Sequence, residues 1–154
     1  MVAALTPDDL INYARFSRNL VERELDRGHG ACVLSRPELA AIVADSLHHF
    51  DGDRYELADF VVMPNHVHVL MAPIGRHSVV AACKSWKQFT ATRINDLLGT
   101  TGHFWQSESF DHLIRSEGQL DKTVRYIHDN PSRAGLSEGE FLIGVGRAYS
   151  HPLP

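Results

Sequence analysis

The sequence predicts an α+β domain in which one antiparallel sheet carries helices packed on one face. Amphipathic segments long enough for helices alternate with short apolar runs that are typical of strands. The chain has 154 residues, a length that suits one domain with its own hydrophobic core. Helices and strands mixed along such a chain favour a sheet covered by a helical layer.

The first element is predicted to be helical over residues 6–27. Thr6 is a typical capping residue and Pro7 suits the first turn of a helix. Apolar residues then recur at roughly helical spacing as far as Leu25. We therefore divide this single domain, 1–154, into an N-terminal helical segment 6–27, a core 30–136 and a C-terminal tail 137–154.

Two further helices are predicted before and after the central apolar runs. Ser35 and Glu38 have the spacing of a capping box, and an apolar stripe follows them as far as Phe50. Residues 79–98 repeat apolar side chains at helical spacing as well. Each of these segments has a hydrophobic side that can pack on the sheet.

Strands are predicted on both sides of Pro64 and Asn65. The segments YELADFVVM and HVHVLMA read either as adjacent strand segments with a bulge or as one long bent strand. Proline confines the break to its own position because it cannot donate a ladder hydrogen bond. A shorter strand is predicted in FDHLIR, after a loop that begins at Gly99.

Two histidines interrupt the second of these apolar runs. Side chains alternate along a strand, so His66 and His68 share one face while Val67 and Val69 take the other. The rise per residue places the two imidazoles about 7 Å apart along the strand, close enough to converge on one divalent ion. The alternative is a solvent-exposed strand face that happens to carry two histidines.

The last helix is predicted to run from Glu117 to Asn130, where Pro131 would end it. Tyr126 and Asn130 are four residues apart and lie off the apolar stripe of this helix. The amide oxygen could ligate a hard cation, and two imidazoles with that oxygen suit a metal that binds phosphate. The alternative for Tyr126 is a half-exposed packing tyrosine.

Composition limits the classes of function. The net charge of −4 argues against a protein that coats duplex DNA nonspecifically, although a local basic patch remains compatible with it. No apolar run approaches the roughly 18 residues that would span a bilayer, and no signal peptide is recognisable. We expect a cytoplasmic, nucleoid-associated protein without a membrane partner.

Four segments together resemble one family. MPNHVHVLM, SWKQFTATRIN, FWQSESFDHLIR and YIHDNPSRAGL are similar, in order and spacing, to REP-associated tyrosine transposases of the HUH superfamily, which are related to single-tyrosine insertion-sequence transposases. The similarity runs from about Leu25 to Leu136. It implies a ferredoxin-like HUH domain in which His66, His68 and Asn130 are metal ligands and Tyr126 is the nucleophile.

The resemblance also implies a reaction and a partner. Mg²⁺ or Mn²⁺ would polarise a phosphate of single-stranded DNA, and Tyr126 would attack phosphorus to give a 5′-phosphotyrosine intermediate and a 3′-hydroxyl. The DNA would form hairpins of palindromic repeats, and the enzyme could be a monomer or a homodimer. Phe104 and Trp105 could stack on unpaired bases or anchor the core. Six cations are candidates for phosphate contacts, or for an ordinary charged surface: Lys84, Lys87, Arg93, Arg115, Lys122 and Arg125.

One feature of the family is not found in the sequence. Relatives have a strand ahead of the first helix, beside the histidine strand, and no such strand is recognisable before Thr6. We therefore expect the chain to lack this strand, which raises two rivals to a DNA-cleaving enzyme. One is a degenerate transposase that binds hairpin DNA, or regulates through it, without cutting. The other is a metal-binding protein unrelated to DNA, in keeping with the ten histidines and the negative charge.

Overall fold

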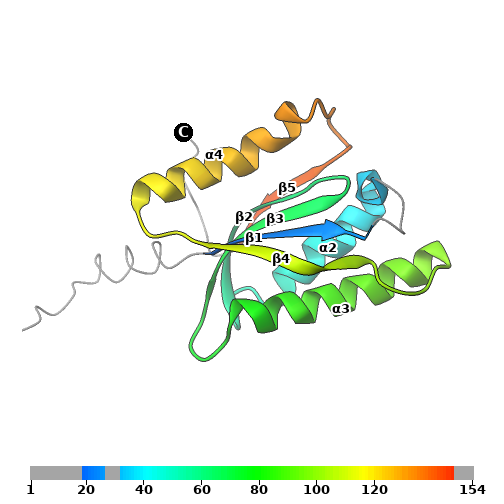
Figure 1. Ribbon diagram of the computed structural model, residues 1–154, viewed down its shortest axis with the longest axis horizontal. Coiled ribbons are helices and arrows are strands. Elements are labelled where there is room, and N and C mark those ends of the chain that lie inside the picture. Colours follow the sequence, from blue (N-terminus) through cyan, green and yellow to red (C-terminus); the bar gives the residue numbers. More distant parts are fainter. Residues whose placement is uncertain (1–18, 27–31, 148–154) are drawn as a thin grey trace, which may run out of the picture.

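A computed structural model describes residues 19–26 and 32–147 of the chain. Within these residues, a five-stranded antiparallel sheet has the order β4-β1-β3-β2-β5. Helices α2 and α3 lie on one side of the sheet and α4 on the other (Figure 1). The α+β class with an antiparallel sheet is thus confirmed. The strands are β1 (Asn19–Leu25), β2 (Tyr55–Val62), β3 (His66–Pro73), β4 (Trp105–Leu113) and β5 (Leu142–Val145), and the helices are α2 (Pro37–His49), α3 (Val79–Leu98) and α4 (Glu117–Arg133).

Strand β1 corrects two predictions. The helix predicted over residues 6–27 is a strand from Asn19 to Leu25, while residues 6–18 lie outside the described part. This strand lies between β4 and β3, so a strand does flank the histidine strand. Its alternation is hidden because Arg23 points to the same side as Val21 and is buried there, 8% exposed, with its guanidinium donating to the Ser107 carbonyl.

The histidine strand belongs to a hairpin. Strands β2 and β3 pair antiparallel around Met63, Pro64 and Asn65, with a bulge in β2 between Leu57 and Phe60. The amide of Met63 donates to the carbonyl of His66 at 2.8 Å and closes the turn. The two predicted strand segments are therefore confirmed as separate strands, and the long bent strand is wrong.

One face of the sheet packs on α2 and α3. Their buried side chains, among them Leu39, Val43 and Trp86, form one core with Val67 and Val69. The bounds predicted for α3 are confirmed. The predicted capping box of α2 is wrong.

A short turn explains the start of α2. Residues Val33–Ser35 form a 3₁₀ turn, in which Ser35 donates its hydroxyl to the Cys32 carbonyl at 2.7 Å. The cap position falls to Arg36, which makes no side-chain cap, and Pro37 begins the helix with a backbone angle suited to its first turn.

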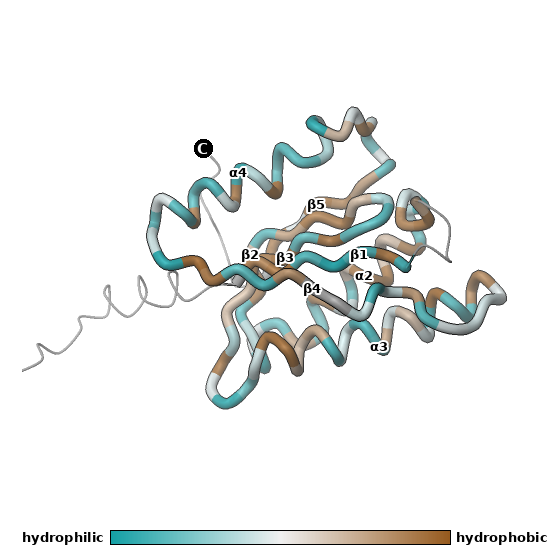
Figure 2. The backbone as a smooth tube through the Cα atoms, viewed as in Figure 1, coloured by the Kyte–Doolittle hydropathy of each residue, from teal (hydrophilic) through white to brown (hydrophobic). Residues whose placement is uncertain are grey.

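The opposite face of the sheet packs on α4, so the prediction of helices on one face is wrong. Leu120, Val124 and Ile127 of α4 form a second core with Val61 and Leu70. The cause is visible in the sequence, because FVVM and VLMA are continuous apolar runs and such runs are buried on both faces. Figure 2 shows these central strands as hydrophobic, while teal and brown alternate along α3 and α4.

Helix α4 continues past the proline that was predicted to end it. Pro131 lies in the last turn, where its missing N–H removes only one hydrogen bond of the helix. Its carbonyl accepts from the Leu136 amide at 3.0 Å and contributes to the end of the helix. Beyond it, β5 adds an edge strand to β2, so part of the predicted tail 137–154 belongs to the sheet.

No helix among the described residues is long and apolar enough to cross a membrane.

Candidate functional site

Two imidazoles lie side by side on the α4 face of the sheet. The apolar side chains that alternate with them, Val67 and Val69, belong to the α2–α3 core. The rings of His66 and His68 have centroids 4.8 Å apart, as the predicted alternation requires. Asn65 is 2.7 Å from His66 through its Oδ1 and the ring Nδ1. In the tautomer with the proton on Nδ1, the ring donates to this oxygen and Nε2 keeps a lone pair.

The neighbouring strand adds a carboxylate that the sequence analysis did not predict. Glu22 on β1 lies directly opposite His68 on β3. One ligand atom from each of Glu22, His66 and His68 lies within 4.8 Å of the others. The helix predicted for this segment concealed Glu22, since only a strand places it in register with His68.

Burial determines the charges of this cluster. It lowers the pKa of His68 to about 4, with a smaller effect from His66, and it also lowers the pKa of His66. Burial, followed by the charge of Glu24, raises the pKa of Glu22. Neutral imidazoles are the form that binds metal ions.

His68 is the deepest member of the cluster, at 1% exposed. Within the described part of the chain neither of its ring nitrogens has a hydrogen-bond partner, and its Nδ1 is 3.7 Å from Glu22 Oε2. Buried polar atoms without partners lower the stability of the fold, and a metal ion would provide a partner for one of these two nitrogens. The three side chains therefore fit a divalent cation in both chemistry and spacing.

Helix α4 carries Tyr126 over these rings. The centroids of the Tyr126 and His68 rings are 5.2 Å apart, in an edge-to-face arrangement. Tyr126 is 38% exposed and lines a groove of about 460 Å³ that also touches Leu20 of β1. The tyrosine is thus open to solvent on one side and in contact with the histidine cluster on the other.

Two other side chains of α4 face the sheet near this position. The amide nitrogen of Asn130 is buried and lacks a hydrogen-bond partner among the described residues. His128 Nε2 lies 2.8 Å from Oδ1 of Asp59, a fully buried carboxylate on β2. This partly buried pair connects the helix to the strand, and His128 is two residues from Tyr126 on the helix.

The family follows from a comparison of the sequence with known families. Residues 35–130 match the model described as transposase IS200-like. The chain belongs to the IS200-like transposase family. The matched range contains both histidines, Tyr126 and Asn130, whereas Glu22 and β5 lie outside it. No curated protein matches the sequence.

Two solved structures share the fold of this transposase. One is a REP-associated tyrosine transposase bound to a REP hairpin, with a TM-score of 0.64, 21% identity, and coverage of 80% of this chain and 71% of that one. The other is a candidate transposase from Deinococcus radiodurans R1, with a TM-score of 0.53, 22% identity, and coverage of 73% of this chain and 88% of that one.

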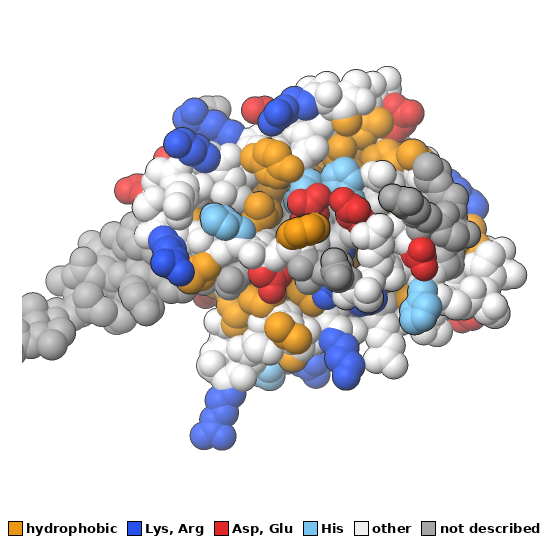
Figure 3. All heavy atoms as spheres, viewed as in Figure 1, with side chains coloured by type: hydrophobic (Ala, Val, Ile, Leu, Met, Phe, Trp, Pro, Cys, Tyr) orange, Lys and Arg blue, Asp and Glu red, His pale blue; other side chains and the backbone are white. Residues whose placement is uncertain are grey.

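The predicted cations of the transposase are divided between the two faces. Lys122 and Arg125 line the groove of Tyr126, together with Arg133, which was not predicted. Figure 3 shows Lys and Arg side chains over α4, and acidic and histidine side chains together near the centre, over the strands. The cations on α3, which packs on the far face, are not brought to Tyr126: Lys84, Lys87 and Arg93. Arg115 is exposed just ahead of α4.

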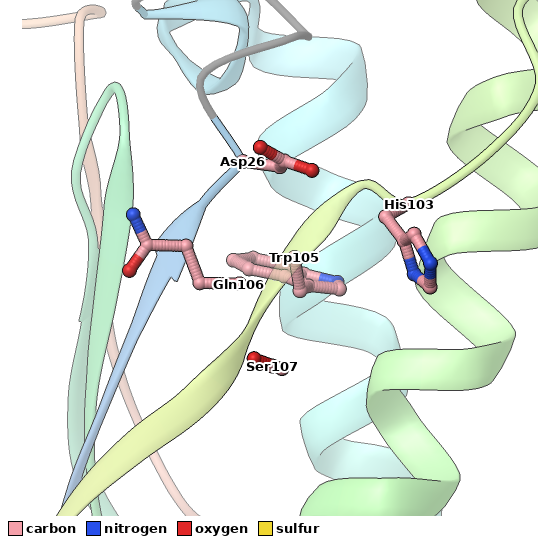
Figure 4. Close-up of a pocket in the computed structure, with 5 residues that line it drawn as sticks. All are labelled: Asp26, His103, Trp105, Gln106 and Ser107. Atoms are coloured by element: carbon pink, nitrogen blue, oxygen red, sulfur yellow. The ribbon is translucent and has the colours of Figure 1, made fainter.

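A second hollow lies where β1 ends and β4 begins. It has about 390 Å³ and is lined by Asp26, His103, Trp105, Gln106 and Ser107. Gln106 and His103 point to opposite sides of it (Figure 4). None of Glu22, His66, His68, Tyr126 and Asn130 lines this hollow. Trp105 is 1% exposed and Phe104 is equally buried, so both anchor the core.

Proposed function

We propose that this transposase is a metal-dependent single-stranded DNA endonuclease and strand transferase whose nucleophile is Tyr126. The observation that supports it most is the contact of the Tyr126 ring with His68, beside His66 and Glu22. A nucleophile, a potential metal site and an open groove thus meet on one face of a chain whose family is that of transposases.

The metal would be held by His66, His68 and Glu22. Asn130 is the fourth candidate, since turning its amide over would direct an oxygen where the unpartnered nitrogen now lies. Mg²⁺ or Mn²⁺ at these ligands would supply Lewis-acid stabilisation to a phosphate oxygen. The strand pair β1–β3 holds three of the ligands rigidly, which favours a preformed site.

The reaction is a transesterification in both directions. The Tyr126 oxygen attacks phosphorus and loses its proton, the bond from phosphorus to the 3′-oxygen breaks, and that oxygen gains a proton to become a 3′-hydroxyl. The protein then carries a 5′-phosphotyrosine. Attack by a 3′-hydroxyl on this phosphorus releases Tyr126 and joins the strands, so the chemistry needs no nucleotide cofactor.

The substrate we propose is single-stranded DNA next to hairpins of palindromic repeats. The solved structure of a REP-associated tyrosine transposase with a REP hairpin supports this choice, because that protein shares the fold. The groove beside Tyr126 carries Lys122, Arg125 and Arg133, which suit a phosphate backbone. Such a protein would work at the nucleoid, as a monomer or a homodimer.

A covalent adduct would test this proposal. The protein is incubated with Mn²⁺ and a hairpin oligonucleotide with a single-stranded flank, labelled at either end, and the products are separated on a denaturing gel. A 5′-phosphotyrosine predicts that the 3′-labelled fragment migrates with the protein, while the 5′-labelled fragment is released.

Two variants make the assay specific. Tyr126→Phe should abolish the adduct, and so should the double change His66→Ala with His68→Ala. His49→Ala is the matched control, because His49 is an exposed histidine on α2, across the sheet, and its adduct should equal that of the wild type. DNA binding without any adduct would instead favour the non-cleaving hairpin-binding domain.

A further inference from the structure

We propose that Phe110 is a stacking platform for an unpaired base of the DNA strand that lies at Tyr126. This inference rests on the proposed function and adds a specific contact to it. It assigns the exposed side of the site, next to the histidine cluster, to a nucleobase rather than to phosphate.

The register of the sheet places Phe110 next to the cluster. Phe110 on β4 is the direct partner of Glu22 on β1, and Glu22 is the direct partner of His68 on β3. Residues directly opposite in antiparallel strands project from the same face. The spacing of neighbouring strands puts the backbone of Phe110 about 10 Å from that of His68, a distance that one nucleotide can bridge.

The aromatic ring is uncovered. Phe110 is 70% exposed, whereas Trp105 on the same strand is 1% exposed in the core. Strand β4 is an edge of the five-stranded sheet in the described chain. Helix α4 packs over side chains of β2 and β3 such as Val61 and Leu70, and reaches Leu20 of β1, while among the described residues Phe110 stays outside this core. An aromatic residue in such a place is available to a ligand.

The surroundings favour a nucleobase as the occupant. The groove of Tyr126 reaches Leu20, and Leu20 pairs with His112, two residues from Phe110 on the same face of β4. A strand whose phosphates lie against Lys122 and Arg125 in that groove would therefore pass Phe110 at its side. Aromatic rings bind unpaired bases irrespective of sequence because every base has a π-face.

Binding can be separated from cleavage in the Tyr126→Phe background. Fluorescence anisotropy with a labelled single-stranded oligonucleotide and Mn²⁺ then reports affinity alone. Phe110→Ala should weaken binding by roughly 5- to 150-fold, the effect of one lost base-stacking contact. Abasic replacements along the oligonucleotide should weaken binding to the Phe110 protein at one or two positions, and should have no further effect there on Phe110→Ala.

Three more variants distinguish stacking from burial of apolar surface. Phe110→Trp should retain affinity, and its fluorescence should be quenched when a base stacks on the new indole. The two native tryptophans, Trp86 and Trp105, are buried, so the quenching would report position 110. Phe110→Leu should lose affinity like alanine, since it is apolar without a π-face. Phe89→Ala should change nothing, because Phe89 is equally an exposed phenylalanine, 53% exposed, on α3 across the sheet.

Three outcomes would overturn the inference. Unchanged affinity in Phe110→Ala would do so, and so would leucine that binds as well as phenylalanine. A wild-type dimer that Phe110→Ala converts to a monomer in sedimentation would assign the ring to a second copy of the chain. If the protein with Tyr126 intact still forms a covalent adduct when any of these outcomes is found, only the stacking inference fails. If no adduct forms with any oligonucleotide, the proposed function itself fails.

Discussion

The two faces of the sheet use the same strands for different purposes. The α2–α3 face holds the larger core, in which Trp86, Trp105 and Phe104 pack edge to face. The α4 face has a smaller core. Beside that core it buries polar groups, namely the His68 ring, the Asp59 carboxylate and the amide nitrogen of Asn130. Both faces bury polar atoms that lack hydrogen-bond partners among the described residues, on the first face those of Arg23, His48 and Trp86. The second face differs because its buried His68 lies against Tyr126. Changes on the first face should therefore affect folding, and changes on the second should affect activity.

The largest expected effect is on the α2–α3 face. Trp105 is fully buried and donates its indole N–H to Thr90 Oγ1 at 2.9 Å. Trp105→Ala should lower the free energy of unfolding by about 3 to 5 kcal/mol, the usual cost of emptying so large a site. Urea unfolding would measure it. Trp105→Phe is the control and should lose less, since the ring remains. A loss below 1 kcal/mol for alanine would contradict the view of this face as the main core.

The next effect concerns the pair that joins α4 to β2. His128→Leu removes the imidazole that lies 2.8 Å from the fully buried Asp59 carboxylate, and should destabilise the protein by about 3 kcal/mol. The double change with Asp59→Leu should recover much of this loss, because no charge is then left buried. A double variant no more stable than the single one would show that the pair contributes by packing alone.

The difference between the two faces also explains which strands and helices could be predicted from the sequence. Strand β3 and helix α3 were predicted well because their apolar spacing reflects the hydrophobic core that they share. Strand β1 was mistaken for a helix because Arg23 is buried where an apolar residue is expected, and Glu22 and Glu24 on the other face carry no apolar signal.

The site was predicted incompletely for the same reason. The sequence placed His66 and His68 on one face because spacing within one element determines a shared face, while the resemblance to the transposase family added Tyr126. The structure brings the three rings together. Glu22 could not be found in this way, since its place beside His68 depends on pairing between strands more than forty residues apart in sequence. The signal that could have revealed it is a two-residue alternation from Val21 to Leu25, which indicates a strand with Glu22 on the face opposite Val21.

A smaller effect is expected on metal binding, and it should distinguish Glu22 from Glu24. Glu22→Gln removes one proposed metal ligand with little change of shape, and should weaken Mn²⁺ binding by about tenfold or more. Calorimetric titration would measure it, alongside the rise in melting temperature that Mn²⁺ produces. Glu24→Gln is the matched control, because it removes the same charge two residues along the strand. Equal losses in both variants would indicate that general negative charge, and not ligation by Glu22, attracts the metal.

The smallest effect tests whether the cations also divide by face. Arg125→Ala with Arg133→Ala removes two charges from the groove of Tyr126, and Lys84→Ala with Arg93→Ala removes two from α3. Because each neutralised phosphate of single-stranded DNA contributes about 0.7 to the slope of log affinity against log salt, only the first pair should reduce that slope. Binding titrations at several salt concentrations, in the Tyr126→Phe background, would measure it. If the α3 pair reduced the slope as much, the DNA would have to contact both faces, and the division of the molecule into a stabilising and a chemical face would fail for its charges.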